Sequence, residues 1–264
     1  MLISSQPPYG SLLLDRDLAG LTRHRSSCTF LVDEKGHLRM LVAHRTAFEV
    51  TGARTSGLLQ APETAHACYV LAHGAGAGMT HPFMTAVADG LAERGIGTLR
   101  YQFPYMERGS KRPDSPAVAQ ATVRAAVAEA PRLLPGLPLF AGGKSYGGRM
   151  TSQAQAEAPL PGVRGLVFLG FPLHPPGRPS DERGKHLFDV QIPMLFLQGT
   201  RDGFAQLELL QALVQRLGSR ASLRLFADAD HSFHLPARAG RKDAEVRVEM
   251  LDVLADWIKM VISG

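Results

Sequence analysis

Short apolar runs alternate with longer amphipathic segments from about residue 46 to the end of the chain. The runs that we expect to form strands are Ala67–Ala72, Gly97–Phe103, Leu137–Ala141, Val163–Gly170, Pro193–Gln198 and Ser222–Ala227. The segments between them that carry apolar residues at helical spacing are Phe83–Arg94, Ala117–Leu133, Gly147–Glu157, Ala205–Leu217 and Asp243–Ile262. Nearly continuous apolar runs suit strands buried on both faces, and parallel strands need crossover helices. The alternation therefore predicts an α/β fold with a mostly parallel, doubly wound sheet and helices on both faces.

Residues 1–45 follow a different pattern. Cys28–Asp33 and Leu38–Ala43 could pair as a β-hairpin, but neither run carries a catalytic motif. We therefore expect residues 1–45 to be an N-terminal extension or hairpin and residues 46–264 to form one catalytic domain, a length that a single hydrophobic core supports. Alternatively, Met40 could be the first residue of the protein, and a chain that begins there would then keep its activity.

The formal net charge of +5 invites the hypothesis of a nucleic-acid partner. The arginines are scattered, however, apart from the stretch Arg108–Arg112, and no run combines basic residues with base-stacking aromatic residues. Dispersed charge of this kind is typical of a solvated surface. We therefore expect no nucleic-acid partner.

The two cysteines, Cys28 and Cys68, do not belong to a C-x-x-C pair. Their spacing predicts neither a zinc site nor a disulfide framework, and reduced thiols are typical of cytosolic proteins. Residues 1–14 have no basic start and only a short apolar run, Leu12–Leu14, which is too little for a signal peptide or a membrane span. We expect a cytoplasmic protein with no membrane partner.

The most informative motif is Gly143–Gly147, which reads G-K-S-Y-G and directly follows the predicted strand Leu137–Ala141. A serine at a sharp turn between a strand and a helix is held in a sparsely populated backbone conformation, for which neighbouring glycines leave room. The turn exposes the hydroxyl, and the N-terminus of the following helix offers unpaired N–H groups and a partial positive charge. We therefore expect Ser145 to be a nucleophile.

A serine nucleophile needs a base that removes its proton. His231 follows the predicted strand Ser222–Ala227, so it should emerge at the same carboxyl edge of the sheet as Ser145. His234 is the nearest alternative, but it lies three residues deeper in the same loop. We therefore assign the base to His231.

The base in turn needs a carboxylate that fixes its tautomer and stabilises the imidazolium. Asp202 follows the predicted strand Pro193–Gln198. The chain order nucleophile, acid, histidine is typical of one class of α/β hydrolase. Asp228 and Asp230 also lie near the histidine, but their proximity in sequence would require an awkward turn to reach its far ring nitrogen. We assign the acid to Asp202 and expect the other two to cap the loop.

An acyl-transfer site also needs N–H donors for the oxyanion, and we expect the first of these from Tyr146. The second should come from His73–Gly78, whose small residues let the backbone approach a substrate. We choose Ala75 for this donor, with Gly76 as the alternative.

Rival motifs in the same segments are incomplete. A P-loop would need a glycine where the chain has Pro138. A dinucleotide fingerprint that begins at Gly74 would meet Met79 in place of its last glycine. His73 and His81 could ligate a metal, but no third ligand lies at a suitable spacing. The sequence therefore predicts no cofactor and no metal.

Several motifs together resemble one family of α/β hydrolases. They are His73–Gly78 with His81–Met84, Arg100–Pro104, Gly143–Arg149, Gly170–Pro175, Gln198–Asp202 and Asp230–Phe233. From about residue 46 onward the chain resembles dienelactone-hydrolase-like bacterial proteins that are related to the hydrolase-like domain of a subunit of the eukaryotic non-specific-lethal histone acetyltransferase complex. The resemblance implies the α/β-hydrolase fold and the same triad, Ser145, Asp202 and His231. It implies no substrate, and dienelactone hydrolase proper has a cysteine where this chain has Ser145.

These features predict a serine hydrolase that cleaves an ester or related acyl bond of a small molecule through a Ser-His-Asp triad and an acyl-enzyme. The alternative is a catalytically silent module that keeps the fold for protein interaction. We expect Tyr101–Arg112 and Phe171–Leu187 to select the substrate, because loops at the carboxyl edge of the strands line the pocket in open α/β sheets. The cations that could bind an acidic substrate group, or simply be solvated, are Arg108, Lys111 and Arg112 in the first loop and Lys144 and Arg149 beside the serine.

Overall fold

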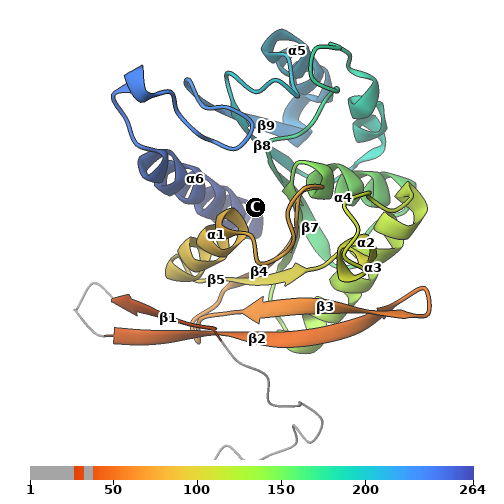
Figure 1. Ribbon diagram of the computed structural model, residues 1–264, viewed down its shortest axis with the longest axis vertical. Coiled ribbons are helices and arrows are strands. Elements are labelled where there is room, and N and C mark those ends of the chain that lie inside the picture. Colours follow the sequence, from red (N-terminus) through yellow and green to blue (C-terminus); the bar gives the residue numbers. More distant parts are fainter. Residues whose placement is uncertain (1–26, 33–37) are drawn as a thin grey trace, which may run out of the picture.

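The computed structural model describes the backbone of residues 27–32 and 38–264 and the side chains from residue 42 onward. Its strands form one nine-stranded sheet in the order β1-β2-β3-β5-β4-β6-β7-β8-β9. Helices cover both faces of the sheet, as Figure 1 shows. The prediction of a mostly parallel, doubly wound α/β sheet is confirmed.

The helices and strands have the following bounds. The strands are β1 (Ser27–Val32), β2 (Leu38–Val50), β3 (Ala53–Gln60), β4 (Ala67–Ala72), β5 (Ile96–Tyr101), β6 (Leu139–Lys144), β7 (Val163–Leu169), β8 (Met194–Gly199) and β9 (Ala221–Phe226). The α-helices are α1 (Pro82–Glu93), α2 (Pro104–Glu107), α3 (Pro116–Leu133), α4 (Tyr146–Glu157), α5 (Leu207–Leu217) and α6 (Asp243–Ser263), and the 3-10 helices are η1 (Glu182–Asp189), η2 (Gly218–Arg220) and η3 (Ala237–Ala239).

Strands β4 to β9 form the parallel part of the sheet. β4 pairs in parallel with β5 and β6, and β7, β8 and β9 follow β6 in the same direction. These six strands correspond to the six runs predicted from the sequence. The match is complete for β4, whereas β6 begins two residues later than predicted and runs on to Lys144.

The first three strands form an antiparallel extension of this sheet. β1 pairs with β2, β2 with β3, and β3 with β5. β2 runs without a break from Leu38 to Val50, so residues on both sides of position 45 share one strand. The division of the chain at that position, and the start at Met40, remain predictions.

Strand β3 is missing from the sequence prediction because its first half is polar. It begins Ala-Arg-Thr-Ser-Gly, and apolar character appears only at Leu58 and Leu59. Thr55 is nevertheless buried, and its hydroxyl donates a hydrogen bond of 2.7 Å to Gln102 O just beyond β5. A strand that satisfies its buried polar groups in this way does not need a continuous apolar run.

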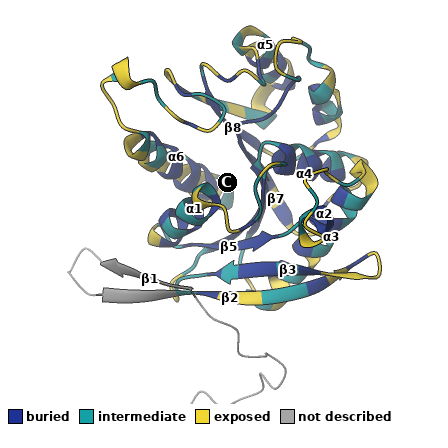
Figure 2. Ribbon diagram, in the orientation of Figure 1, coloured by how far each residue is buried: buried dark blue, intermediate teal, exposed yellow. Residues whose placement is uncertain are grey.

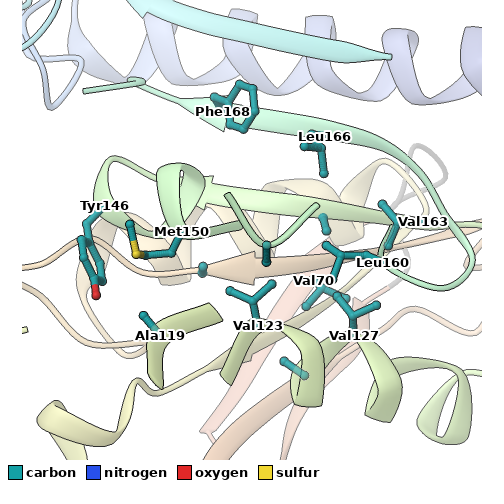
Figure 3. Close-up of a cluster of buried hydrophobic side chains, with 14 of the residues drawn as sticks. Val70, Ala119, Val123, Val127, Tyr146, Met150, Leu160, Val163, Leu166 and Phe168 are labelled. Atoms are coloured by element: carbon teal, nitrogen blue, oxygen red, sulfur yellow. The ribbon is translucent and has the colours of Figure 1, made fainter. Parts of the chain in front are cut away.

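Two hydrophobic cores lie on opposite faces of the sheet, and side chains of β4 alternate between them. Val70 packs with Val123 of α3 and Met150 of α4 in the core drawn in Figure 3. Leu71 points to the other face, into a core that includes Leu254 of α6 and Leu91 of α1. Figure 2 shows that the central strands are buried. Among the described residues, no helix is both long and apolar enough to cross a membrane.

Candidate active site

Ser145 occupies a sharp turn between β6 and α4. β6 ends at Lys144 and α4 begins at Tyr146, so one residue connects the two elements. Its φ of 50° and ψ of −115° are sparsely populated by residues with a side chain. Its N–H donates a hydrogen bond of 3.2 Å to Leu169 O of β7, which ties the turn to the neighbouring strand.

Two glycines let this turn lie directly against the end of β4. A Cβ added to Gly143, whose φ is +150°, would lie 2.2 Å from Ala72 O. A Cβ added to Gly147 would lie 2.6 Å from His73 O. Since backbone atoms occupy these positions, the glycines of the G-x-S-x-G motif are required for packing.

Replacing Gly143 with alanine should lower the free energy of unfolding by about 3 kcal/mol or more, because the methyl group meets a backbone carbonyl and the positive φ is strained. Urea unfolding followed by circular dichroism measures this change. Gly203→Ala is the matched control, since nothing lies within 4 Å of the added Cβ, and its stability should change by less than about 1 kcal/mol. Equal stability of the two variants would contradict the packing argument.

The structure brings the three predicted triad side chains together. His231 Nε2 lies 2.8 Å from Ser145 Oγ, and His231 Nδ1 lies 2.7 Å from Asp202 Oδ2. Asp202 is buried, and its carboxylate also accepts hydrogen bonds from Gln198 Nε2 and Phe204 N. A buried carboxylate held in this way keeps the proton on Nδ1, so that Nε2 can accept the serine proton.

The neighbouring residues in the histidine loop are engaged elsewhere. His234 is exposed, and its Nδ1 lies 2.7 Å from Asp243 Oδ2. Asp230 Oδ1 accepts hydrogen bonds from Ser232 N and His234 N, so it caps the loop. Asp228 N donates a hydrogen bond to the hydroxyl of Thr200.

A second serine and histidine also form a hydrogen bond in this structure. Ser152 Oγ lies 2.8 Å from His186 Nε2, but Ser152 is fully buried on α4 and its hydroxyl is also 3.0 Å from Arg149 O. Neither residue lines the pocket that contains Ser145. The Ser152–His186 pair therefore offers a control for Ser145 within the same protein: a serine bonded to a histidine but outside the pocket.

The glycine-rich loop after β4 is held from behind by aromatic residues. His73 Nδ1 donates to Gly74 O, and His73 Nε2 accepts a hydrogen bond of 3.0 Å from Phe103 N. Tyr105 Oη donates a hydrogen bond of 2.8 Å to Ala75 O. Ala75 lines the pocket beside Ser145. The backbone of this loop is therefore fixed by residues that lie outside the pocket.

The loop also contains a histidine that must remain neutral. Burial lowers the pKa of His73 to about 4, while its hydrogen bond to Gly74 and the charge of Glu107 oppose the shift. The unfolded chain takes up a proton at this position below about pH 6.5, and the folded protein does so only near pH 4. Stability attributable to His73 is therefore complete above pH 6.5 and falls as the pH is lowered.

We expect His73→Gln to reduce the acid dependence of stability. Between pH 7 and pH 4 the unsubstituted protein should lose about 3 kcal/mol through this residue, and the variant should lack that loss. Urea unfolding curves collected at several pH values measure the difference in slope. Parallel curves for the two proteins would contradict a neutral, buried His73.

Ser145 opens into a pocket of about 690 Å³. One wall comes from the glycine-rich loop and the start of α1, including Ala75, Phe83 and Met84. Another part of the lining comes from the histidine loop and the start of α6, including Phe233 and Arg247. The rings of Phe83 and Phe233 stack on each other, with centroids 6.0 Å apart and an interplanar angle of 5°. Most of the pocket surface is apolar, which suits an acyl group.

The prediction that Tyr101–Arg112 and Phe171–Leu187 select the substrate is wrong for this pocket, because neither loop lines it. The first part of each loop turns inward: Phe103 and Tyr105 of the first and Phe171 of the second are fully buried in the core. The first loop supports Ala75 from behind, and the second packs through η1 against α4 and α5. Aromatic residues at strand ends were thus core residues rather than pocket residues.

Of the five cations considered from the sequence, the pocket contains only Lys144. Arg108 forms a 2.6 Å ion pair with Asp114 away from it. The sequence prediction missed Arg247, which lines the pocket on the first turns of α6. Arg247 lies four residues after Asp243 at the start of a predicted helix, so the two side chains share one helix face. This spacing was the one sequence signal that could have pointed to Arg247.

The matching family model covers residues 65–259 and describes an alpha/beta hydrolase domain. Similar solved structures include an alpha-beta serine hydrolase homologue from Coxiella burnetii, with 19% identity and a TM-score of 0.66 over 80% of this chain and 97% of that one. Another is dienelactone hydrolase from Anabaena variabilis, with 20% identity and a TM-score of 0.67 over 83% of this chain and 98% of that one.

A third similar structure is a serine hydrolase without a lid from Xanthomonas campestris, with 20% identity and a TM-score of 0.65 over 81% of this chain and 94% of that one. At these identities the structural matches establish the fold. The family model, in contrast, extends from β4 to α6 and includes Ser145, Asp202 and His231. The chain therefore belongs to the alpha/beta hydrolase domain family.

Proposed function

We propose that this protein is a serine hydrolase that cleaves an ester or related acyl bond of a small molecule through Ser145, His231 and Asp202. The observation that supports this proposal most is the continuous hydrogen-bonded chain from Asp202 Oδ2 through the His231 ring to Ser145 Oγ. The serine end of this chain opens into the apolar pocket. A nucleophile, its base and a space for the acyl group therefore lie together.

In the first half of the reaction, Ser145 Oγ attacks the acyl carbon while His231 Nε2 takes the hydroxyl proton. The bond between the acyl carbon and the leaving alcohol then breaks, and His231 returns the proton to the alcohol. In the second half, His231 takes a proton from water, the resulting hydroxide attacks the acyl-enzyme, and the proton returns to Ser145. Asp202 stabilises the imidazolium in both halves.

The oxyanion formed in each half needs donors that are already in place. In our proposal, Tyr146 N–H at the start of α4 and Ala75 N–H in the glycine-rich loop are these donors. Support for the first comes from its position next to the nucleophile at a helix N-terminus. Support for the second comes from the fixed backbone at Ala75, whose carbonyl is bound by Tyr105. The chemistry needs no cofactor, and we expect the protein to act in the cytoplasm.

The competing function is that of a catalytically silent module that keeps the fold for protein interaction. The resemblance to the hydrolase-like domain of a histone acetyltransferase complex subunit motivates this alternative. An activated serine distinguishes the two functions, because a silent module has no need for a reactive hydroxyl.

Labelling with a fluorophosphonate probe tests the proposed function. The serine oxygen displaces fluoride from phosphorus, and we expect mass spectrometry to find the modified peptide at Ser145 in the native protein and to find none after heat denaturation. The buried Ser152 should stay unmodified and provides a control within the same chain. Absence of labelling at Ser145, or labelling at Ser152 instead, would contradict the proposal.

A further inference from the structure

Lys144, which carries a positive charge, lines the pocket next to the nucleophile. Its side chain is partly buried and lines the pocket, and its ammonium group lies 5.9 Å from the ring centroid of Phe83 and 5.7 Å from that of Phe233. Nζ donates one hydrogen bond to His231 O. An ammonium group has three N–H donors, so two remain for another acceptor.

The acidic groups around this cation are engaged by other partners. Asp202 binds His231, and Asp230 accepts main-chain hydrogen bonds in the histidine loop. Asp243, at the pocket rim, accepts hydrogen bonds from His234 Nδ1 and Leu235 N. In the part of the chain that the structure describes, no carboxylate oxygen lies within 4.0 Å of Lys144 Nζ. A partly buried cation without a carboxylate partner is costly for a protein to keep.

The pKa of Lys144 reflects this environment. Burial lowers it to about 8, and the charges of Asp202 and Asp230 oppose the shift. The group is therefore protonated at neutral pH, and the desolvation that lowers its pKa also strengthens its attraction for an anion.

Arg247 adds a second positive charge to the lining of the pocket. It is partly buried on α6, and no carboxylate among the described residues lies within ion-pair distance of its guanidinium group. The lining of the pocket thus contains two cations, while its single lining acid, Asp243, already has partners. This distribution favours an anionic ligand with an apolar body.

We propose that the pocket selects acyl groups that carry a carboxylate, so that the preferred substrates are half-esters of dicarboxylic acids whose free carboxylate binds Lys144. This inference rests on the proposed hydrolase function. The hydrocarbon part of the acyl chain lies against Phe83 and Phe233, and the ester carbonyl lies at Ser145. Arg247 adds a longer-range attraction for the anion, which salt screens.

Paired esters measure this selectivity. 4-Nitrophenyl half-esters from glutarate to suberate are each compared with the neutral ester of the same carbon number, from valerate to octanoate, at about pH 7 and low ionic strength. Uncatalysed hydrolysis is subtracted for every ester. For at least one chain length we expect kcat/KM to be about tenfold or more higher for the half-ester, the effect of a charge-assisted hydrogen bond in a partly buried site.

Lys144→Gln should abolish this preference, since it removes the charge and keeps an N–H donor for His231 O. The readout is the ratio of kcat/KM for the half-ester to kcat/KM for the neutral ester, measured in the same variant. Any loss of activity caused by a shift of the histidine loop affects both values and cancels. Arg247→Gln should reduce the ratio by only a few fold, and added salt should remove that difference. Lys259→Gln, at an exposed position on α6, is the matched control and should leave the ratio unchanged.

The outcomes separate this inference from the proposed function. Hydrolysis of neutral esters with no preference for half-esters at any chain length overturns the inference and leaves the hydrolase proposal standing. A preference that survives Lys144→Gln but disappears in Arg247→Gln overturns the assignment to Lys144. No hydrolysis of either ester class together with no fluorophosphonate labelling is the failure of the hydrolase proposal itself. If the Lys144 variant does not fold, the ratio in the unsubstituted protein still decides whether selectivity for an anion exists.

Discussion

Ser145→Ala is expected to lower kcat/KM for 4-nitrophenyl esters by about 10⁴-fold or more. The substitution removes the oxygen that forms the acyl-enzyme, and it leaves His231 and Asp202 in place with no nucleophile to activate. Residual hydrolysis would come from binding and from the oxyanion donors alone. Initial rates measured on purified protein, with circular dichroism to verify folding, give the comparison.

Ser152→Ala is the matched control for this variant. It removes a hydroxyl from α4, the helix that follows Ser145, and this hydroxyl is also bonded to a histidine but lies outside the pocket. We expect kcat/KM to stay within a few fold of the value for the unsubstituted protein. The free energy of unfolding should fall by about 1 to 2 kcal/mol, because buried hydrogen bonds to His186 and Arg149 O are lost. Equal rates for the Ser145 variant and the unsubstituted protein would refute the nucleophile assignment, and a greater loss in the Ser152 variant would transfer it to the second pair.

Asp202→Asn should lower kcat by about 10⁴-fold with little change in KM. An amide can donate to His231 Nδ1 where the carboxylate only accepts, which favours the tautomer that carries its proton on Nε2. That proton then faces Ser145 Oγ, and the histidine cannot act as a base. The pH dependence of kcat and a binding measurement with the Ser145→Ala background separate this effect from a loss of substrate affinity.

Asp230→Asn tests whether the effect is specific to Asp202. Asp230 lies next to His231 in sequence, but its carboxylate caps the loop through Ser232 N and His234 N. Since an asparagine oxygen can accept the same main-chain hydrogen bonds, we expect a loss of no more than several fold. Comparable losses in the two variants would mean that the position of the loop, rather than the carboxylate on His231, determines activity.

Most of the parallel sheet could be predicted because its strands are buried on both faces. In β4, for example, every residue is buried and apolar, so the run is visible in the sequence without any knowledge of its neighbours. Strand β3 depends instead on partners: Thr55 is buried only because Gln102 O accepts its hydrogen bond. Contacts of that kind join distant parts of the chain and leave no local pattern.

The meeting of Ser145, Asp202 and His231 was predictable for a topological reason. Each follows a strand that runs in the same direction, so all three emerge at one edge of the sheet. The residues that line the pocket were harder to predict from the sequence, because they depend on which loops turn inward. Tyr105 and Arg247 illustrate the point, since the sequence favoured the loop of Tyr105 as the lining and the structure assigns that role to Arg247.

The strand order places the N-terminal strands and the strands that carry the site at opposite edges of the sheet. β1 to β3 lie at one margin, whereas β8 and β9, which precede Asp202 and His231, lie at the other. A change along β2 reaches the site through side-chain packing, from Phe48 to Tyr101 and Phe103 and on to Tyr146 beside Ser145. Because two of the three proposed triad residues directly follow β8 and β9, we expect changes at that edge of the sheet to disturb the site more than changes along β1 to β3.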